Sequence, residues 1–245
     1  MKSYNNISKQ HLRIGVLTIV FWTSLLTFSF ALPKPIMAES REGLPGRRVG
    51  GGTRSNCDAS IKQLTALSPK NNLGLTKAPY PTLFFFLPQT STPKMVEFVL
   101  RDDKNHLVYE KTFTKTASSG IINITLPQST SLPPLTIDKN YRWYLSMICE
   151  PKNRAKDIVV SGWIRRVQSN PTLSKKLEQV PAADRAALYA DAGLWSDALV
   201  TLAQLRYSKP NDSKLIASWT QLLQSEKLEA IAQEPLLNIE PSTNR

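Results

Sequence analysis

Histidine and cysteine are scarce in this sequence. The 245 residues include two histidines and two cysteines, and beyond residue 38 the only histidine is His106. A structural zinc site takes four such ligands, and most acid–base catalysis near neutral pH uses histidine. We therefore expect no metal site, no cofactor and no catalytic residue. A hydrolase is the least favoured function, because no GxSxG motif marks a nucleophile.

The charged run Arg101–Asn105 lies between two predicted strands and ends at His106. We interpret His106 as a solvated surface residue of a turn. Asp102 and Asp103 could form the carboxylate pair of a glycoside hydrolase. We reject that site, because adjacent residues at a strand end are expected to point to opposite sides.

The chain begins with a basic and then apolar segment. Residues 1–13 contain three basic residues, residues 14–30 contain no charge, and a proline-containing stretch then ends at Ala38. This order is typical of a secretory signal peptide, so we interpret residues 1–38 as a signal peptide. An uncleaved membrane anchor is the alternative, because the apolar run reaches the lower limit for a spanning helix. The protein is expected to be exported: periplasmic, envelope-associated or extracellular.

Cys57 and Cys149 are the two cysteines. Outside the cytoplasm two cysteines in one chain usually pair, and this disulfide would stabilise the fold by roughly 4 kcal/mol through loop closure. A redox-active pair is the alternative, but the CxxC spacing is missing.

Residues 39–56 are rich in glycine and arginine and show no apolar periodicity, so they predict an irregular N-terminal arm. A glycine loop beside arginines can hold a phosphate or sulfate. This candidate anion site also takes in two arginines at the end of the last predicted strand. Its residues are Arg47, Arg48, Arg54, Arg165 and Arg166. The favoured alternative is an arm that is solvated or docked on the surface.

Residues 57–170 consist of short runs of β-branched and aromatic residues separated by proline, asparagine and glycine. The run TLFFFL at 82–87 is typical of a strand buried on both faces. Residues 141–149 alternate, with Trp143 on the apolar stripe, and residues 95–113 predict a hairpin. We predict an immunoglobulin-like antiparallel β-sandwich, with a small barrel as the alternative.

Residues 171–232 change to a helical period. The stretch YADAGLWSDALVTL at 189–202 resembles the middle of one tetratricopeptide repeat. A single repeat cannot bury its own face, so we predict a helical hairpin packed on the sandwich. The predicted class is thus mainly β with α, and residues 233–245 are interpreted as a polar tail.

Positive charge is concentrated in the β-rich part. Residues 39–170 contain 19 basic and 10 acidic residues, whereas residues 171–245 contain 8 basic and 9 acidic residues. We expect a non-enzymatic binding or interaction module whose partner is another envelope protein or an acidic polysaccharide, bound in the second case through a basic β-domain surface. Nucleic acid is not expected as a partner, and a membrane contact is expected only through an uncleaved leader.

Several segments together resemble one family. They are GRRVGGGTR at 46–54, LTAL at 64–67, YPTLFFFLP at 80–88, EFVLRD at 97–102, YRWYLSMICEP at 141–151, GWIRRV at 162–167 and ALYADAGLWSDAL at 187–199. The sequence resembles the cyanobacterial family called domain of unknown function 928. The resemblance implies a bacterial envelope or secreted setting and implies no reaction, ligand or partner.

Overall fold

The computed structural model describes residues 44–50, 57 and 62–237, and all of them belong to one compact unit, residues 41–245. The predicted signal peptide, Arg54 and the last eight residues lie outside the described residues. The described part is mainly β with α, as the sequence predicts.

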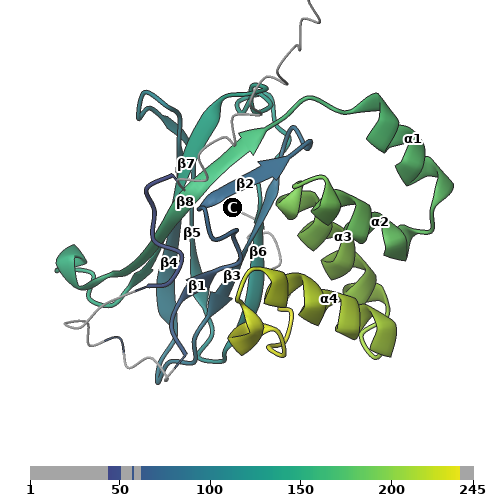
Figure 1. Cartoon of the computed structure of the whole chain (residues 1–245). Coiled ribbons are helices and arrows are strands. Elements are labelled where there is room, and N and C mark those ends of the chain that lie inside the picture. The colour runs from purple at the N-terminus through teal and green to yellow at the C-terminus, as the bar shows by residue number, and fades with distance from the viewer. Residues whose placement is uncertain (1–43, 51–56, 58–61, 238–245) are drawn as a thin grey trace, which may run out of the picture. The chain divides into compact units, whose positions relative to one another are not determined.

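Eight strands form two sheets in the described part of the chain (Figure 1). The three-stranded sheet has the order β1–β3–β6, with β1 at Thr65–Ala66, β3 at Thr82–Leu87 and β6 at Gly120–Thr125. The five-stranded sheet has the order β2–β8–β7–β4–β5. Its strands are β2 at Leu73–Thr76, β4 at Lys94–Arg101, β5 at Leu107–Lys115, β7 at Asn140–Ile148 and β8 at Ile158–Arg166.

The two sheets face each other across one hydrophobic core. Phe85 of β3 contacts Trp143 of β7, with ring centroids 5.4 Å apart, and both side chains are buried. Gly162 of β8 lies under the Trp143 indole, and a Cβ at this glycine would be 2.4 Å from Trp143 Cζ2. The alternation predicted for residues 141–149 therefore places Trp143 in the core, as expected.

The described part of the chain has four helices: the last three share a core with the other side of the three-stranded sheet, whereas the first packs against the second. They are α1 at Pro171–Gln179, α2 at Ala182–Asp191, α3 at Trp195–Ser208 and α4 at Ser213–Ser225, followed by a 3₁₀ turn at Glu229–Ile231. Phe84 and Phe86 pack with Trp219 and other helical residues in a second core, whereas Phe85 belongs to the first. The prediction that residues 82–87 are buried on both faces is confirmed.

Two of the four described helices, α1 and α4, begin with a side-chain cap. Asp212 caps α4 by accepting hydrogen bonds from the backbone of Lys214 and Leu215. Gly193 adopts a φ of +74° after α2, a conformation that favours glycine. No side chain caps α3, because the residue before it is Leu194.

The predicted sandwich is antiparallel throughout, but β2 pairs with β8 in parallel. The reason is that the N-terminal segment also uses this edge of β8. Arg47 exchanges two backbone hydrogen bonds with Ser161 in the antiparallel sense, and Val49 bridges to Thr65 of β1. Residues 64–71 run antiparallel to the N-terminal segment, since the Leu44 N–H also donates to the Asn71 carbonyl, and β2 continues in that direction, parallel to β8.

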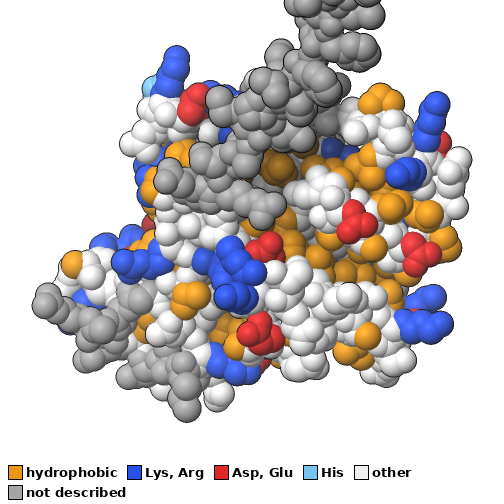
Figure 2. Space-filling view, viewed as in Figure 1, with side chains coloured by type: hydrophobic (Ala, Val, Ile, Leu, Met, Phe, Trp, Pro, Cys, Tyr) orange, Lys and Arg blue, Asp and Glu red, His pale blue; other side chains and the backbone are white. Residues whose placement is uncertain are grey.

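The segment interpreted as a polar tail is in part attached to the sheet. Leu236 forms a parallel bridge with Ile121 of β6, and the Leu237 N–H donates to the Ile121 carbonyl. Residues 233–237 therefore lie along the edge of the three-stranded sheet. Figure 2 shows hydrophobic side chains gathered over the helices on the right of the view, and Lys and Arg side chains both in the middle of the view and around its edge.

Candidate functional site

Arg48, predicted to bind an anion, instead joins the N-terminal segment to the helices. Its guanidinium donates to the Ser68 carbonyl at 3.2 Å and to the Glu226 carbonyl at 2.8 Å. Glu226 is the C-terminal cap of α4, where free carbonyl groups attract a cation. Burial lowers the pKa of Arg48, and the carboxylates of Glu226 and Glu229 oppose that shift.

Arg166 likewise binds the protein itself, because its guanidinium donates to the Leu135 carbonyl at 3.0 Å. Arg166 directly follows Arg165 in β8, and consecutive residues of a strand point to opposite faces of the sheet. The four predicted anion-binding residues that the structure describes therefore do not converge on one site. Arg47 and Arg165 lie on the outer face of the five-stranded sheet, which the helices do not cover.

The outer face of the five-stranded sheet brings a different basic group together. The Arg142 guanidinium carbon lies 5.0 Å from the ring centroid of Tyr144 and 5.5 Å from that of Trp163. The Arg142 side chain thus contacts two aromatic rings that flank it on β7 and β8. Arg165 lies on the same face and donates from Nε to Asn140 Oδ1 at 2.7 Å.

The strand register continues this face in both directions. Arg142 is opposite both Trp163 of β8 and Arg101 of β4. Ser161, opposite Tyr144, is also opposite Arg47. Since residues directly opposite each other in antiparallel strands share a face, Arg47 and Arg101 border the group. We call Arg142, Tyr144, Trp163 and Arg165 the Arg142 face.

Acidic residues on this sheet surface lie toward its other edge. Glu97 of β4 forms an ion pair with Arg154, and Glu110 is in the edge strand β5. The basic part therefore coincides with β7, β8 and the N-terminal segment.

Trp163 is half-buried, and its indole N–H donates to the Pro45 carbonyl at 2.8 Å. This contact fixes the ring beside the N-terminal segment while leaving part of it accessible. Trp163 thus lies on the face of β8 opposite the buried Ile164.

Sequence reasoning missed Arg142 and Tyr144, although the signal was present. In residues 141–149 the apolar core residues alternate with a second set that faces outward and includes Arg142, Tyr144 and Ser146. The sequence interpretation used only the apolar set.

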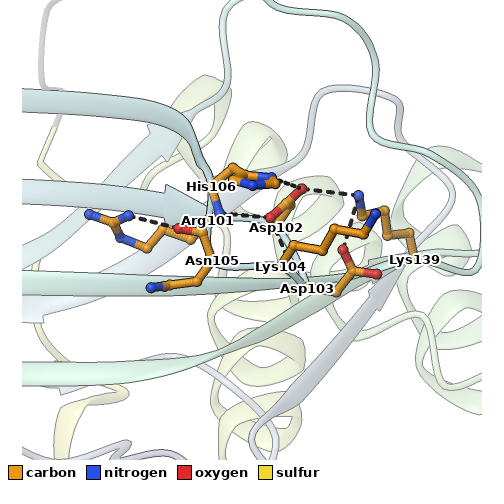
Figure 3. A network of polar contacts seen from close by, with 7 residues as sticks. All are labelled: Arg101, Asp102, Asp103, Lys104, Asn105, His106 and Lys139. Carbon is orange, nitrogen blue, oxygen red and sulfur yellow. Dashed lines mark hydrogen bonds and ion pairs between the residues drawn. The ribbon is translucent and has the colours of Figure 1, made fainter.

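The turn between β4 and β5 holds a polar network around Asp102 (Figure 3). Asp102 accepts hydrogen bonds from the backbone N–H groups of Lys104 and His106. Its Oδ2 also lies 3.3 Å from His106 Nδ1 and 3.2 Å from Lys139 Nζ. Desolvation raises the pKa of Asp102, but these hydrogen bonds outweigh it and lower the pKa to about 2.

Both carboxylates of the turn contact one ammonium, because Lys139 Nζ also lies 3.0 Å from Asp103 Oδ1. The expectation that Asp102 and Asp103 point to opposite sides is therefore wrong. The reason is that β4 ends at Arg101, so the two residues follow turn geometry instead of strand alternation. The His106 side chain is 71% exposed, as expected for a surface residue, and the network is that of a stabilised turn.

Cys57 and Cys149 form a disulfide, with Cα atoms 4.8 Å apart. Cys57 is buried in the core between the sheets, and Cys149 follows the end of β7. The bond ties the chain before β1 to the five-stranded sheet.

Among the described residues, no three histidine, cysteine, aspartate or glutamate side chains are grouped so that they could hold a metal ion. In the same part of the chain, no helix has the length and apolar character needed to cross a bilayer.

These features define a disulfide-linked two-sheet protein with a helical layer and a basic aromatic sheet face. The family described as Domain of Unknown Function (DUF928) matches residues 49–236, and the chain belongs to this family. The comparison with curated proteins gives no match.

Proposed function

We propose that the protein is an exported, non-enzymatic binding module that binds an acidic polysaccharide through the Arg142 face. The observation that carries this proposal is the Arg142 guanidinium between the rings of Tyr144 and Trp163, with Arg165 on the same face. Export rests on the predicted leader and is supported by the disulfide, since disulfides persist in oxidising compartments.

The chemistry of the face fits an acidic sugar chain. Guanidinium groups bind carboxylates and sulfates through paired N–H donors, and aromatic rings provide flat apolar surfaces for sugar rings. Arg142 Nε has no hydrogen-bond partner within the described part of the chain, so ring contacts hold this side chain instead of an ion pair. Its remaining donors can therefore meet a ligand without first breaking a salt bridge.

The fold offers an open sheet surface suited to an extended ligand. We further propose that the two sheets form an immunoglobulin-like sandwich. The orders β8–β7–β4–β5 and β1–β3–β6 correspond to the G-F-C-C′ and A-B-E orders of that fold. Tyr141, near the start of β7, accepts a hydrogen bond from the Thr136 N–H five residues upstream, like a tyrosine corner.

The helical layer favours a second candidate partner, another envelope protein. Hydrophobic side chains gather over the helices in Figure 2, and α2 buries only Ala186 among its alanines. The hairpin of α2 and α3, joined at Gly193, supports the proposal of one tetratricopeptide-like unit here. This candidate predicts a protein complex whose stability depends little on salt, because apolar contacts are not screened.

The test of polysaccharide binding uses immobilised alginate, a polymer of carboxylated sugars, with neutral dextran as the reference. The mature chain should bind alginate and not dextran, and its affinity should fall as salt rises. The double variant Arg142→Gln/Arg165→Gln should bind at least about tenfold more weakly, equivalent to about 1.4 kcal/mol.

The matched control is Arg185→Gln/Lys214→Gln, which removes the same two charges from exposed helical positions. This control should bind alginate like the wild type. An equal loss in both double variants would mean that net charge alone is responsible, and absent or salt-independent alginate binding would overturn the proposal.

A further inference from the structure

A recess of about 320 Å³ lies between the sheets and the helices, apart from the Arg142 face. It is bounded by β2, the connection from β2 to β3, and the helices α2 and α3. Its polar and aromatic lining includes Thr76, Tyr80, Tyr189, Asp197, Thr201 and Gln204. The volume is at the lower end of the range of small-molecule sites, about 300 to 1,000 Å³. We call it the Asp197 recess.

Asp197 is in the first turn of α3 and its carboxylate is directed back to the sheet. Oδ2 accepts the Lys77 N–H at 3.1 Å, and the Thr76 hydroxyl donates to the same carboxylate. Burial raises the pKa of Asp197, and these hydrogen bonds and the Lys77 charge oppose that shift. A carboxylate has about four acceptor positions. The Thr76 hydroxyl, the Lys77 N–H and the N–H of Asp197 itself occupy three of them, so acceptor capacity for one ligand hydroxyl remains.

Four other polar side chains of the recess have no hydrogen bond within the described residues: Tyr80, Tyr189, Ser196 and Gln204. In contrast, the hydroxyl of Thr201 already donates to the Asp197 carbonyl, and that of Thr82 is bonded to Thr125. The recess thus combines two aromatic rings with two phenol groups, one serine hydroxyl, one amide and one carboxylate that can still form hydrogen bonds.

The charges select among ligand classes. A buried carboxylate disfavours an anion, so sulfate and phosphate do not suit the recess. A ligand cation would compete with Lys77, whose ammonium lies 5.0 Å from the Tyr189 ring centroid and already interacts with Asp197. A neutral ligand with several hydroxyl groups matches both the acceptors and donors, and its apolar ring face matches the tyrosines.

We propose that the Asp197 recess binds one neutral pyranose ring. The recess lies at the β2 edge on the side opposite the Arg142 face, because Thr76, which lines it, is paired with Arg166, whereas the preceding Leu75 is paired with Arg165. The proposal does not depend on alginate binding at the Arg142 face, since none of the four residues of that face lines the recess.

Saturation-transfer NMR with the full mature chain tests this proposal, with the methyl pyranosides of glucose, galactose and mannose as probes. At least one glycoside should receive saturation from the protein. Gln204→Ala and Tyr189→Ala should each weaken its binding at least about tenfold. Gln221→Ala, an exposed helical glutamine outside the recess, should leave it unchanged.

The face variant Arg142→Gln/Arg165→Gln should retain glycoside binding, so the two proposals fail separately. Circular dichroism confirms that each variant is folded. Absence of transfer to all three glycosides, or transfer that Gln204→Ala and Tyr189→Ala leave intact, would overturn the proposal. Tetramethylammonium that binds in place of the glycosides would also overturn it and identify a cation site.

Discussion

Breaking the disulfide is expected to remove a large part of the free energy of unfolding. Cys57 and Cys149 are 92 positions apart, and seven of the eight described strands, β1 to β7, lie inside the loop that they close. Loop-closure entropy for a cross-link of this length corresponds to about 4 to 5 kcal/mol. Domains are stable by about 5 to 15 kcal/mol in total, so the loss leaves a marginal fold.

The assay compares urea unfolding of the oxidised protein, the reduced protein and the variant Cys57→Ala/Cys149→Ala. Reduced wild-type protein is the matched control for the variant, because it keeps the Cys57 side chain in the core, where it is 1% exposed. Compared with the oxidised protein, the reduced protein and the variant should both unfold at lower urea concentrations. Their thermal unfolding midpoints should be about 10 to 20 °C lower.

The slope of the unfolding free energy with urea identifies the cause. If the cross-link acts by restricting the unfolded chain, the slope should increase when it is broken, because the released chain exposes more surface. Equal urea midpoints for reduced and oxidised protein would refute this reasoning.

Three other substitutions test the core, the turn and Arg48. Gly162→Ala places a Cβ 2.4 Å from Trp143 Cζ2 and should cost about 1 to 3 kcal/mol in urea unfolding, more than Ala at an exposed site. Asp102→Asn should lower stability at neutral pH. The folded-state pKa of Asp102 is depressed to about 2, so its contribution is present above the unfolded pKa of about 4 and disappears as pH falls toward 2, where the urea midpoints of variant and wild type should converge. Arg48→Met keeps the aliphatic stem but loses two hydrogen bonds to carbonyls, so the free energy of unfolding should fall by about 1 to 3 kcal/mol. Alginate affinity should stay unchanged. Weaker alginate binding without a loss of stability would show that Arg48 binds the ligand.

The elements with strong periodicity were predictable from the sequence. The run at 82–87 was predicted to be buried on both faces, and the alternation of residues 141–149 placed Trp143 in the core. Both patterns are local, since burial of a strand face imposes a period of two on the residues themselves.

The short strands and the arginine contacts were not predictable in the same way. β1 has two residues and β2 has four, too few for a period, and β2 is parallel because another segment occupies part of the β8 edge. The contact of Arg48 with Glu226 joins residues 178 positions apart, so no local pattern contains it. Predicting the Arg142 face would have required the register between β7 and β8, because that register places Arg142 opposite Trp163, and sequence periodicity does not give it.

The strand β3 contributes alternate side chains to two separate cores, Phe85 to one and Phe84 and Phe86 to the other. Deletion of the helices would therefore leave two large phenyl groups facing water on the three-stranded sheet, and such a surface promotes aggregation. The helical and sheet regions are consequently not separable modules. Fusion or truncation at residue 170 should yield insoluble protein, and the intact chain should melt in a single cooperative step.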